Sequence, residues 1–194
     1  MQGSQDSESE ATGPFDTSVE SVNPWVISAP RPGLALATWL KEFREDVVRV
    51  VDETGAVLLR GFDVNGASGL ERSIESLFGP AVEYPGDLQS VARRKPMGGR
   101  ITTSTEYSAG LALRLHSECS FAVSWPMHIY FLAEVVATSG GGTPIADNRS
   151  IYHRMDPDIR ASFERRGVTY LRNFGFGSTP PWQDIFNSSD PSVV

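Results

Sequence analysis

The spacing of apolar residues changes near residue 100, and this change constrains the fold more than any other feature of the chain. Before it, apolar side chains recur at helical spacing over residues 38–54 and about 68–78, with Gly55 and Gly79 as helix ends. After it, short segments rich in Thr, Tyr, Phe, Ile and Val are separated by Gly, Pro and Asp turns. We therefore predict a mixed α+β fold in which two helices support a set of short strands.

The expected strands are all short. Pro24, Pro30 and Pro32 mark an extended opening segment, and the apolar run at residues 56–59 predicts a buried strand between the two helices. The later segments with strand composition are residues 100–105, 112–118, 128–136, 143–147 and 168–173, and a short helix is expected over residues 150–165. This arrangement predicts a jelly-roll-like core with helical support.

Most of the negative charge of the chain lies in its first 24 residues. The 194-residue chain has a net charge of −7, and residues 1–24 contain five acidic residues and no Lys or Arg. Because such a Ser- and Glu-rich segment cannot bury a core, we expect residues 1–24 to be a disordered acidic tail and residues 25–194 to form the domain. The only basic cluster, at residues 93–95, lacks interleaved aromatic residues, which argues against nucleic-acid binding.

The sequence also bears on the cellular compartment. No stretch approaches the roughly eighteen apolar residues of a membrane span, and the N-terminus lacks the basic start and apolar core of a signal peptide. Cys119 is the only cysteine, so no intrachain disulfide can form, and we expect its side chain to be a small core residue. These features predict a cytoplasmic protein that does not contact a membrane.

His116 and Glu118 are the residues most suited to chemistry. On a strand, residues two apart point to the same face, so these side chains would project together into a barrel interior. They would then supply two ligands of the 2-His-1-carboxylate triad that holds Fe(II) and leaves positions open for substrate and oxygen. A His-x-Glu match alone is weak evidence, and the alternative is a packed core histidine beside a solvated glutamate.

An ordered series of motifs surrounds this pair. In chain order they are Thr-Glu-Tyr at residues 105–107, His-Ser-Glu at 116–118, Trp-Pro at 125–126, Gly-Gly-Gly-Thr-Pro-Ile-Ala-Asp at 140–147 and Tyr-Leu-Arg-Asn at 170–173. The series resembles the taurine dioxygenase (TauD/TfdA) superfamily of Fe(II)/2-oxoglutarate-dependent oxygenases, nearest the branch of clavaminate synthase and the syringomycin-type amino-acid hydroxylases. The resemblance covers roughly residues 56–187 and implies an incomplete double-stranded β-helix, of which residues 25–194 are the N-terminal part.

The resemblance implies a role for each matching residue. His116 and Glu118 would be iron ligands, and Thr143 would help to bind 2-oxoglutarate, although an ordinary turn residue is the alternative for Thr143. Glu106 and Tyr107 would approach the substrate, and strand-end packing is an equally good reading of both. The implied cofactors are Fe(II), 2-oxoglutarate and O2. The implied substrate is an amino acid or amino-acid-derived metabolite, either free or tethered to a carrier protein.

Two groups that the resemblance requires find no match in the chain. We expect His128 to pack across strands and His153 to lie on the connecting helix, so neither is the distal iron ligand. The arginine that pairs with 2-oxoglutarate is also missing, and Arg172 is better explained by a salt bridge. The chain is therefore expected to be an oxygenase part that needs a complementing C-terminal half. The alternatives are a truncated non-catalytic remnant, half of a split protein, and a cupin-like metal-binding protein.

Overall fold

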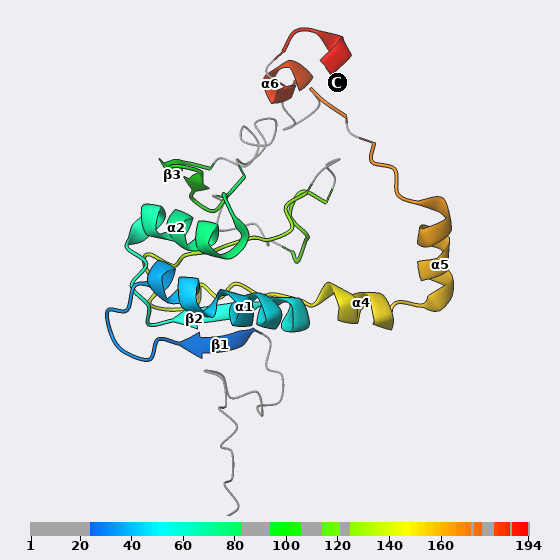
Figure 1. Cartoon of the computed structure of the whole chain (residues 1–194). Helices are drawn as coiled ribbons and strands as arrows, with labels where there is room; N and C mark the ends of the chain where they lie inside the picture. The colour runs from blue at the N-terminus through cyan, green and yellow to red at the C-terminus, as the bar shows by residue number, and fades with distance from the viewer. Residues whose placement is uncertain are drawn as a thin grey trace, which may run out of the picture. The chain divides into compact units, whose positions relative to one another are not determined.

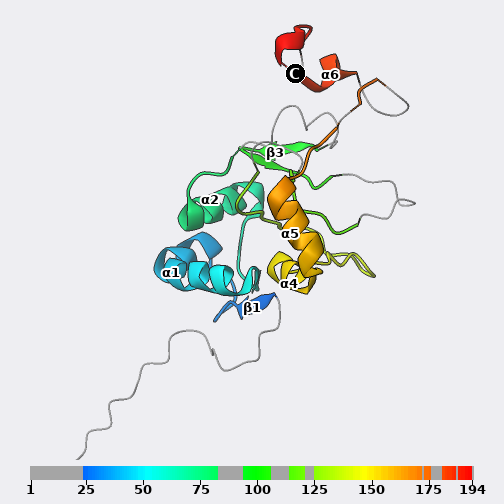
Figure 2. The ribbon, with the colours of Figure 1, turned by 90° about the vertical axis from the view of Figure 1, so that its right-hand side faces the viewer.

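The computed structural model describes seven segments of the chain, which Figure 1 and Figure 2 show in two orientations. These segments are residues 24–82, 94–105, 114–120, 125–171, 173–175, 181–186 and 188–193. The described residues form a mixed α/β structure with few strands, in two compact units, Met1–Asp63 and Val64–Val194. The mixed fold class is therefore confirmed, whereas all of the expected acidic tail except Pro24 lies outside the described residues.

The first unit contains a parallel strand pair connected by a long helix. Strand β1 (Trp25–Ser28) pairs with β2 (Val57–Arg60) in a register that joins Trp25 to Val57. The predicted strand at 56–59 is confirmed with a shift of one residue, but it is half-buried rather than buried. The opening segment, predicted only as extended, forms β1 and gives β2 its partner.

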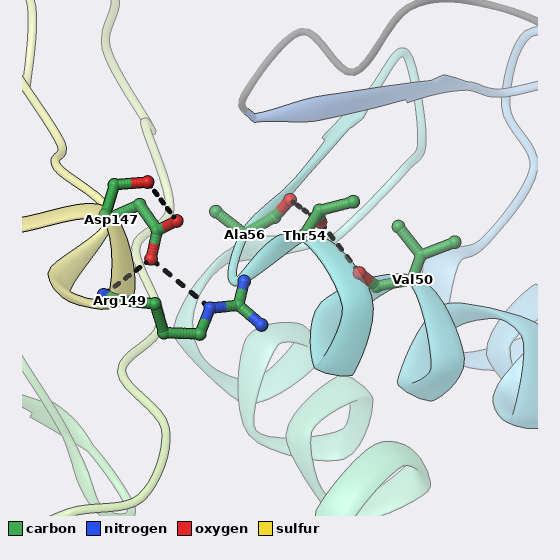
Figure 3. Close-up of polar contacts among 6 residues, drawn as sticks. Val50, Thr54, Ala56, Asp147 and Arg149 are labelled. Carbon is green, nitrogen blue, oxygen red and sulfur yellow. Dashed lines mark hydrogen bonds and ion pairs between the residues drawn. The ribbon is translucent and has the colours of Figure 1, made fainter. Parts of the chain in front are cut away.

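Helix α1 (Leu36–Thr54) supplies most of the core of this unit. Its apolar face buries Leu40 and Val47 completely, and each such side chain stabilises the fold by about 1.5–3 kcal/mol. The helix ends as predicted at Gly55, whose left-handed backbone donates its N–H to the Val51 carbonyl oxygen at 2.7 Å. The hydroxyl of Thr54 lies 2.7 Å from the Val50 carbonyl oxygen and 3.0 Å from that of Ala56, and so reinforces this end (Figure 3).

The second unit begins with helix α2 (Gly66–Phe78), which confirms the second predicted helix. Ile74 and Leu77 on its apolar face are buried. A short antiparallel hairpin packs on this helix and consists of β3 (Pro96–Gly98) and β4 (Ile101–Thr102). The carboxylate of Glu71 fixes the hairpin, because its Oε1 atom accepts the backbone N–H of Arg100 at 3.0 Å.

Most of the strands expected after residue 100 are absent from the described residues. Only Ile101–Thr102 of the predicted segment 100–105 is a strand. No strand forms in the described parts of the other four predicted strand segments, which are residues 112–118, 128–136, 143–147 and 168–173. An extended segment counts as a strand only when a neighbour pairs with its backbone, and composition does not reveal whether a neighbour is present. The double-stranded β-helix is thus not formed by the described residues.

The helix expected over residues 150–165 is two helices. Helix α4 (Asn148–Arg154) ends at Met155, and α5 (Pro157–Arg166) begins after Asp156. The break follows from Pro157, which has no N–H to continue α4 but suits the first turn of a new helix. Asp156 caps this turn, since its Oδ1 atom accepts the backbone N–H of Asp158 at 2.9 Å.

The last described elements are helix α6 (Trp182–Phe186) and a 3-10 turn at Pro191–Val193. Neither was predicted, and both are too short for apolar periodicity to indicate them. Across the described segments, no helix is both long enough and apolar enough to cross a membrane.

Candidate metal centre

His116 and Glu118 lie close together, although not on the predicted strand. Residues 114–117 have no regular secondary structure, and residues 118–120 form a turn that Ser120 N and the Ser117 carbonyl oxygen close at 3.4 Å. Cys119 has a left-handed backbone with φ 55° and is buried, which confirms the prediction that it is a small core residue. The turn leaves the His116 Nε2 atom 3.8 Å from the Glu118 Oε2 atom. The strand prediction was wrong here, but the two side chains do converge.

The hydrogen bonding of His116 determines which ring nitrogen faces the glutamate. Its Nδ1 atom lies 2.8 Å from the Arg114 carbonyl oxygen. A carbonyl oxygen can only accept, so Nδ1 carries the proton, and in the neutral ring Nε2 keeps a lone pair. Metal-binding histidines are oriented by the same kind of bond from the opposite nitrogen. The Nε2 lone pair is therefore available on the side where Glu118 lies.

The carboxylate of Glu118 has a second neighbour, Arg94. The Arg94 Nη2 atom lies 3.0 Å from the Glu118 Oε1 atom, and the two side chains are only 16% and 19% exposed. Oε1 thus faces the guanidinium, whereas Oε2 faces His116. Sequence reasoning missed Arg94 and treated it only as part of the basic cluster at residues 93–95. The two residues are 24 positions apart, and no local pattern links them.

The donor atoms suit a divalent first-row metal ion such as Fe(II). Imidazole nitrogen and carboxylate oxygen are among its usual ligands. With metal–donor bonds of about 2.0–2.2 Å, two donors of one ion are at most about 4.4 Å apart, and donors at right angles are about 3 Å apart. The 3.8 Å separation of His116 and Glu118 is within this reach and needs a modest closure. In the described part of the chain, no three or more His, Cys, Asp or Glu side chains form a metal-binding group.

The glycine-rich motif leads to a capped helix rather than a strand. Gly140 and Gly141 have left-handed backbones, and a Cβ atom on Gly141 would lie 2.6 Å from the Cβ atom of Ala137. Thr143 is exposed, and among the described residues no hydrogen bond or ion pair joins it to His116 or Glu118. Its predicted role in binding 2-oxoglutarate stays a prediction. Glu106 and Tyr107, the predicted substrate residues, lie outside the described residues.

Asp147 at the end of this motif caps helix α4. Its Oδ1 atom accepts the backbone N–H of Arg149 at 2.9 Å, and its Oδ2 atom accepts the Ser150 hydroxyl at 2.9 Å (Figure 3). The Ser150 hydroxyl, followed by the Arg149 N–H, lowers the pKa of Asp147 below its usual value. The next residue, Asn148, donates from Nδ2 to the Ser117 hydroxyl at 3.0 Å. This bond joins the first residue of α4, directly after the glycine-rich motif, to the residue between His116 and Glu118, and sequence reasoning assigned Ser117 no role.

The other two histidines lie in aromatic clusters. The His128 ring stacks on Phe78 of α2 with centroids 3.8 Å apart, so its predicted packing role is confirmed, but against a helix rather than across strands. Burial raises the pKa of the neighbouring Tyr130 to about 12. His153 lies on α4, as predicted for the connecting helix, with its ring edge-on to Tyr152. Arg172 lies outside the described residues.

Comparison with known proteins agrees with the predicted lineage. A family model described as "Taurine catabolism dioxygenase TauD, TfdA family" matches residues 18–193. The chain is 34% identical over 180 residues to a dapdiamide synthesis protein of Enterobacter agglomerans, covering 90% of this chain and 54% of that protein. It is 27% identical over 185 residues to a clavaminate synthase-like protein of Arabidopsis thaliana, covering 89% and 55% respectively. The chain therefore spans about half the length of the curated relatives it matches.

Proposed function

The chain belongs to the taurine catabolism dioxygenase TauD/TfdA family, and on that premise we propose that it is the first part of an Fe(II)- and 2-oxoglutarate-dependent oxygenase. The predicted branch is supported by the relative named as clavaminate synthase-like. The observation that carries the proposal is the convergence of the His116 Nε2 and Glu118 Oε2 atoms at 3.8 Å. The substrate class is an amino acid or amino-acid-derived metabolite, as the relationship to a dapdiamide synthesis protein suggests.

His116 and Glu118 would hold the iron, and neighbouring groups of the chain orient both side chains. The Arg114 carbonyl oxygen fixes the His116 ring so that Nε2 presents its lone pair. Bound Fe(II), together with 2-oxoglutarate and O2, would supply the oxidising chemistry that inserts a hydroxyl group. The protein contributes the positions of the two donors, with the Glu118 side chain 19% exposed and the His116 side chain 53% exposed.

Thr143 is proposed to bind a carboxylate of 2-oxoglutarate through its hydroxyl. Support comes from the Asn148–Ser117 hydrogen bond, which ties the helix that follows the Thr143 segment to the His116–Glu118 turn. The left-handed glycines before Thr143 also allow a close approach of backbone to ligand. Glu106 and Tyr107 are proposed to contact the substrate, or its carrier-tethered form, on the strength of their motif alone.

The third iron ligand and the 2-oxoglutarate arginine are proposed to come from a complementing C-terminal half. The relatives are nearly twice as long as this chain, which leaves ample sequence for both groups. An exposed apolar row in the described structure supports the idea: its side chains alternate along the segment and are 51–82% exposed, namely Trp125, Met127, Ile129 and Phe131. Large apolar side chains in such a row mark a surface that another polypeptide layer covers. In the complete protein this layer would close the jelly roll.

A second candidate is a remnant without turnover, which the absence of a third donor beside His116 and Glu118 in the described residues favours. Anaerobic addition of Fe(II) and 2-oxoglutarate separates the two. The oxygenase interpretation predicts a visible charge-transfer band from a complex held by His116 and Glu118, which disappears in His116→Ala and persists in His153→Ala, because the His153 ring packs edge-on against Tyr152. A colourless wild-type sample, or a band that survives His116→Ala, would contradict the proposal.

A further inference from the structure

Arg94 forms an unusually well-covered ion pair with a proposed iron ligand. Its Nη2 atom lies 3.0 Å from the Glu118 Oε1 atom, with the two side chains 16% and 19% exposed. The Arg49–Asp46 pair has nearly the same separation, 3.1 Å, but its side chains are 47% and 37% exposed. Exposed pairs of that kind contribute little because solvent screens them, whereas a covered pair restrains both partners.

The pair divides the two carboxylate oxygens of Glu118 between different neighbours. Oε1 accepts from the guanidinium, and Oε2 faces the His116 Nε2 atom at 3.8 Å. A free glutamate side chain loses up to about 2 kcal/mol of rotamer entropy when it is fixed. Because the bond to Arg94 already fixes the Glu118 side chain, metal binding causes little further loss of its rotamer entropy.

We infer that Arg94 is a positioning residue that makes Glu118 a one-oxygen metal ligand. The inference rests on the proposed function, since it assumes that His116 and Glu118 bind the metal. With Oε1 held by Arg94, only Oε2 turns toward the ion, and a coordination position stays open for the cosubstrate or oxygen, as an open site of this type requires. Without Arg94, the guanidinium would no longer hold Oε1, and Glu118 could bind the ion through Oε1 as well as Oε2 and so occupy that position.

Arg94 has two opposing effects on metal affinity, and the larger effect decides whether the loss of Arg94 weakens or tightens metal binding. The positive charge of the guanidinium, 3.0 Å from the Glu118 carboxylate, opposes the binding of a divalent cation there, so by charge alone loss of Arg94 would tighten metal binding. Removal of groups that orient metal ligands typically lowers metal affinity by about 10–100-fold. Positioning therefore outweighs repulsion, and loss of Arg94 weakens metal binding.

The test is calorimetric titration of the full chain with Co(II) alone. We expect the Co(II) affinity to fall at least about 10-fold in both Arg94→Met and Arg94→Lys, since lysine keeps the charge but not the planar fork that orients a carboxylate. Arg49→Met is the matched control, which removes a guanidinium from an exposed ion pair and should leave the affinity unchanged. Unchanged or tighter Co(II) binding in Arg94→Met overturns the inference. Wild-type Co(II) affinity in Arg94→Lys overturns it as well, because a positive charge without the planar guanidinium would then be sufficient.

The Co(II) absorption spectrum at saturation separates positioning from a purely structural role. A variant that is merely less stable binds less metal but gives the wild-type spectrum once saturated, whereas a switch from one to two carboxylate oxygens changes the band intensities. We expect a changed spectrum in Arg94→Met, and an unchanged one overturns the one-oxygen assignment. If Co(II) binding is lost in His116→Ala but is unchanged in the Arg94 variants, only this inference is rejected. If the wild-type chain does not bind Co(II), the proposed function is rejected together with it.

Discussion

Leu40→Ala and Leu171→Ala make the same chemical change at opposite extremes of exposure. Leu40 on α1 is 0% exposed, and Leu171 is 89% exposed. Each substitution removes three carbon atoms, which at about 0.8 kcal/mol per buried carbon amounts to about 2.4 kcal/mol for Leu40. The cavity left behind adds to this, so the free energy of unfolding should fall by about 2.5–5 kcal/mol in Leu40→Ala. In Leu171→Ala it should change by no more than about 0.5 kcal/mol.

Urea unfolding followed by far-UV circular dichroism measures both changes. Leu40→Ala should move the midpoint to lower urea with an unchanged slope, whereas Leu171→Ala should superimpose on the wild type. Equal shifts in the two variants, or a loss below about 1 kcal/mol for Leu40→Ala, would refute the assignment of Leu40 to the core. The same pair also probes the complementing half, because Leu171→Ala should become destabilising only when another polypeptide layer covers that surface.

Three further predictions concern α2, α4 and Tyr130. Gly69→Ala should lower the free energy of unfolding by about 1–3 kcal/mol, measured by urea against Ser68→Ala, because the added Cβ atom would lie 2.5 Å from the Val64 carbonyl carbon. The hydrogen bonds of its cap lower the pKa of Asp147 in the folded chain. Asp147 should therefore stabilise α4 fully above its pKa in the unfolded chain, and this stabilisation should be lost as the pH falls through its pKa in the folded chain. In Asp147→Ala, circular dichroism should show no such loss of helix at acid pH. Because burial raises the pKa of Tyr130 from 10.0 to about 12, the free energy of unfolding should fall as the pH rises across that interval. Tyr130→Phe should remove a tyrosinate signal that appears near pH 12 in an ultraviolet titration.

The helices were predictable because their signals are local. The spacing of apolar residues and a terminal glycine placed the end of α1 at Gly55 and the end of α2 at Phe78, as the structure has them. Pro157 could have shown the break between α4 and α5, since a proline begins a helix far more readily than it continues one. The strands after residue 100 failed because their composition indicates an extended backbone but not the neighbour that would pair with it.

The metal site was predictable only in part. The His-x-Glu pattern identified His116 and Glu118, and they converge even though a turn rather than a strand brings them together. Arg94 and Asn148 escaped prediction because each reaches the site from a distant segment, 24 residues before Glu118 and 31 residues after Ser117 respectively. Such long-range contacts depend on packing, and one sequence without its relatives gives no pattern for them.

The parallel pairing of β1 with β2 has a consequence for the order in which the chain is made. In the part of the chain that the structure describes, the backbone partners of β1 lie between Ala56 and Arg60, and helix α1 is the connection that brings those residues back. Protein chains emerge from the ribosome at about 5–20 residues per second, and domains generally fold N-terminal first. The first unit, which ends at Asp63, can thus close during synthesis, seconds before His116 and Glu118 have been added.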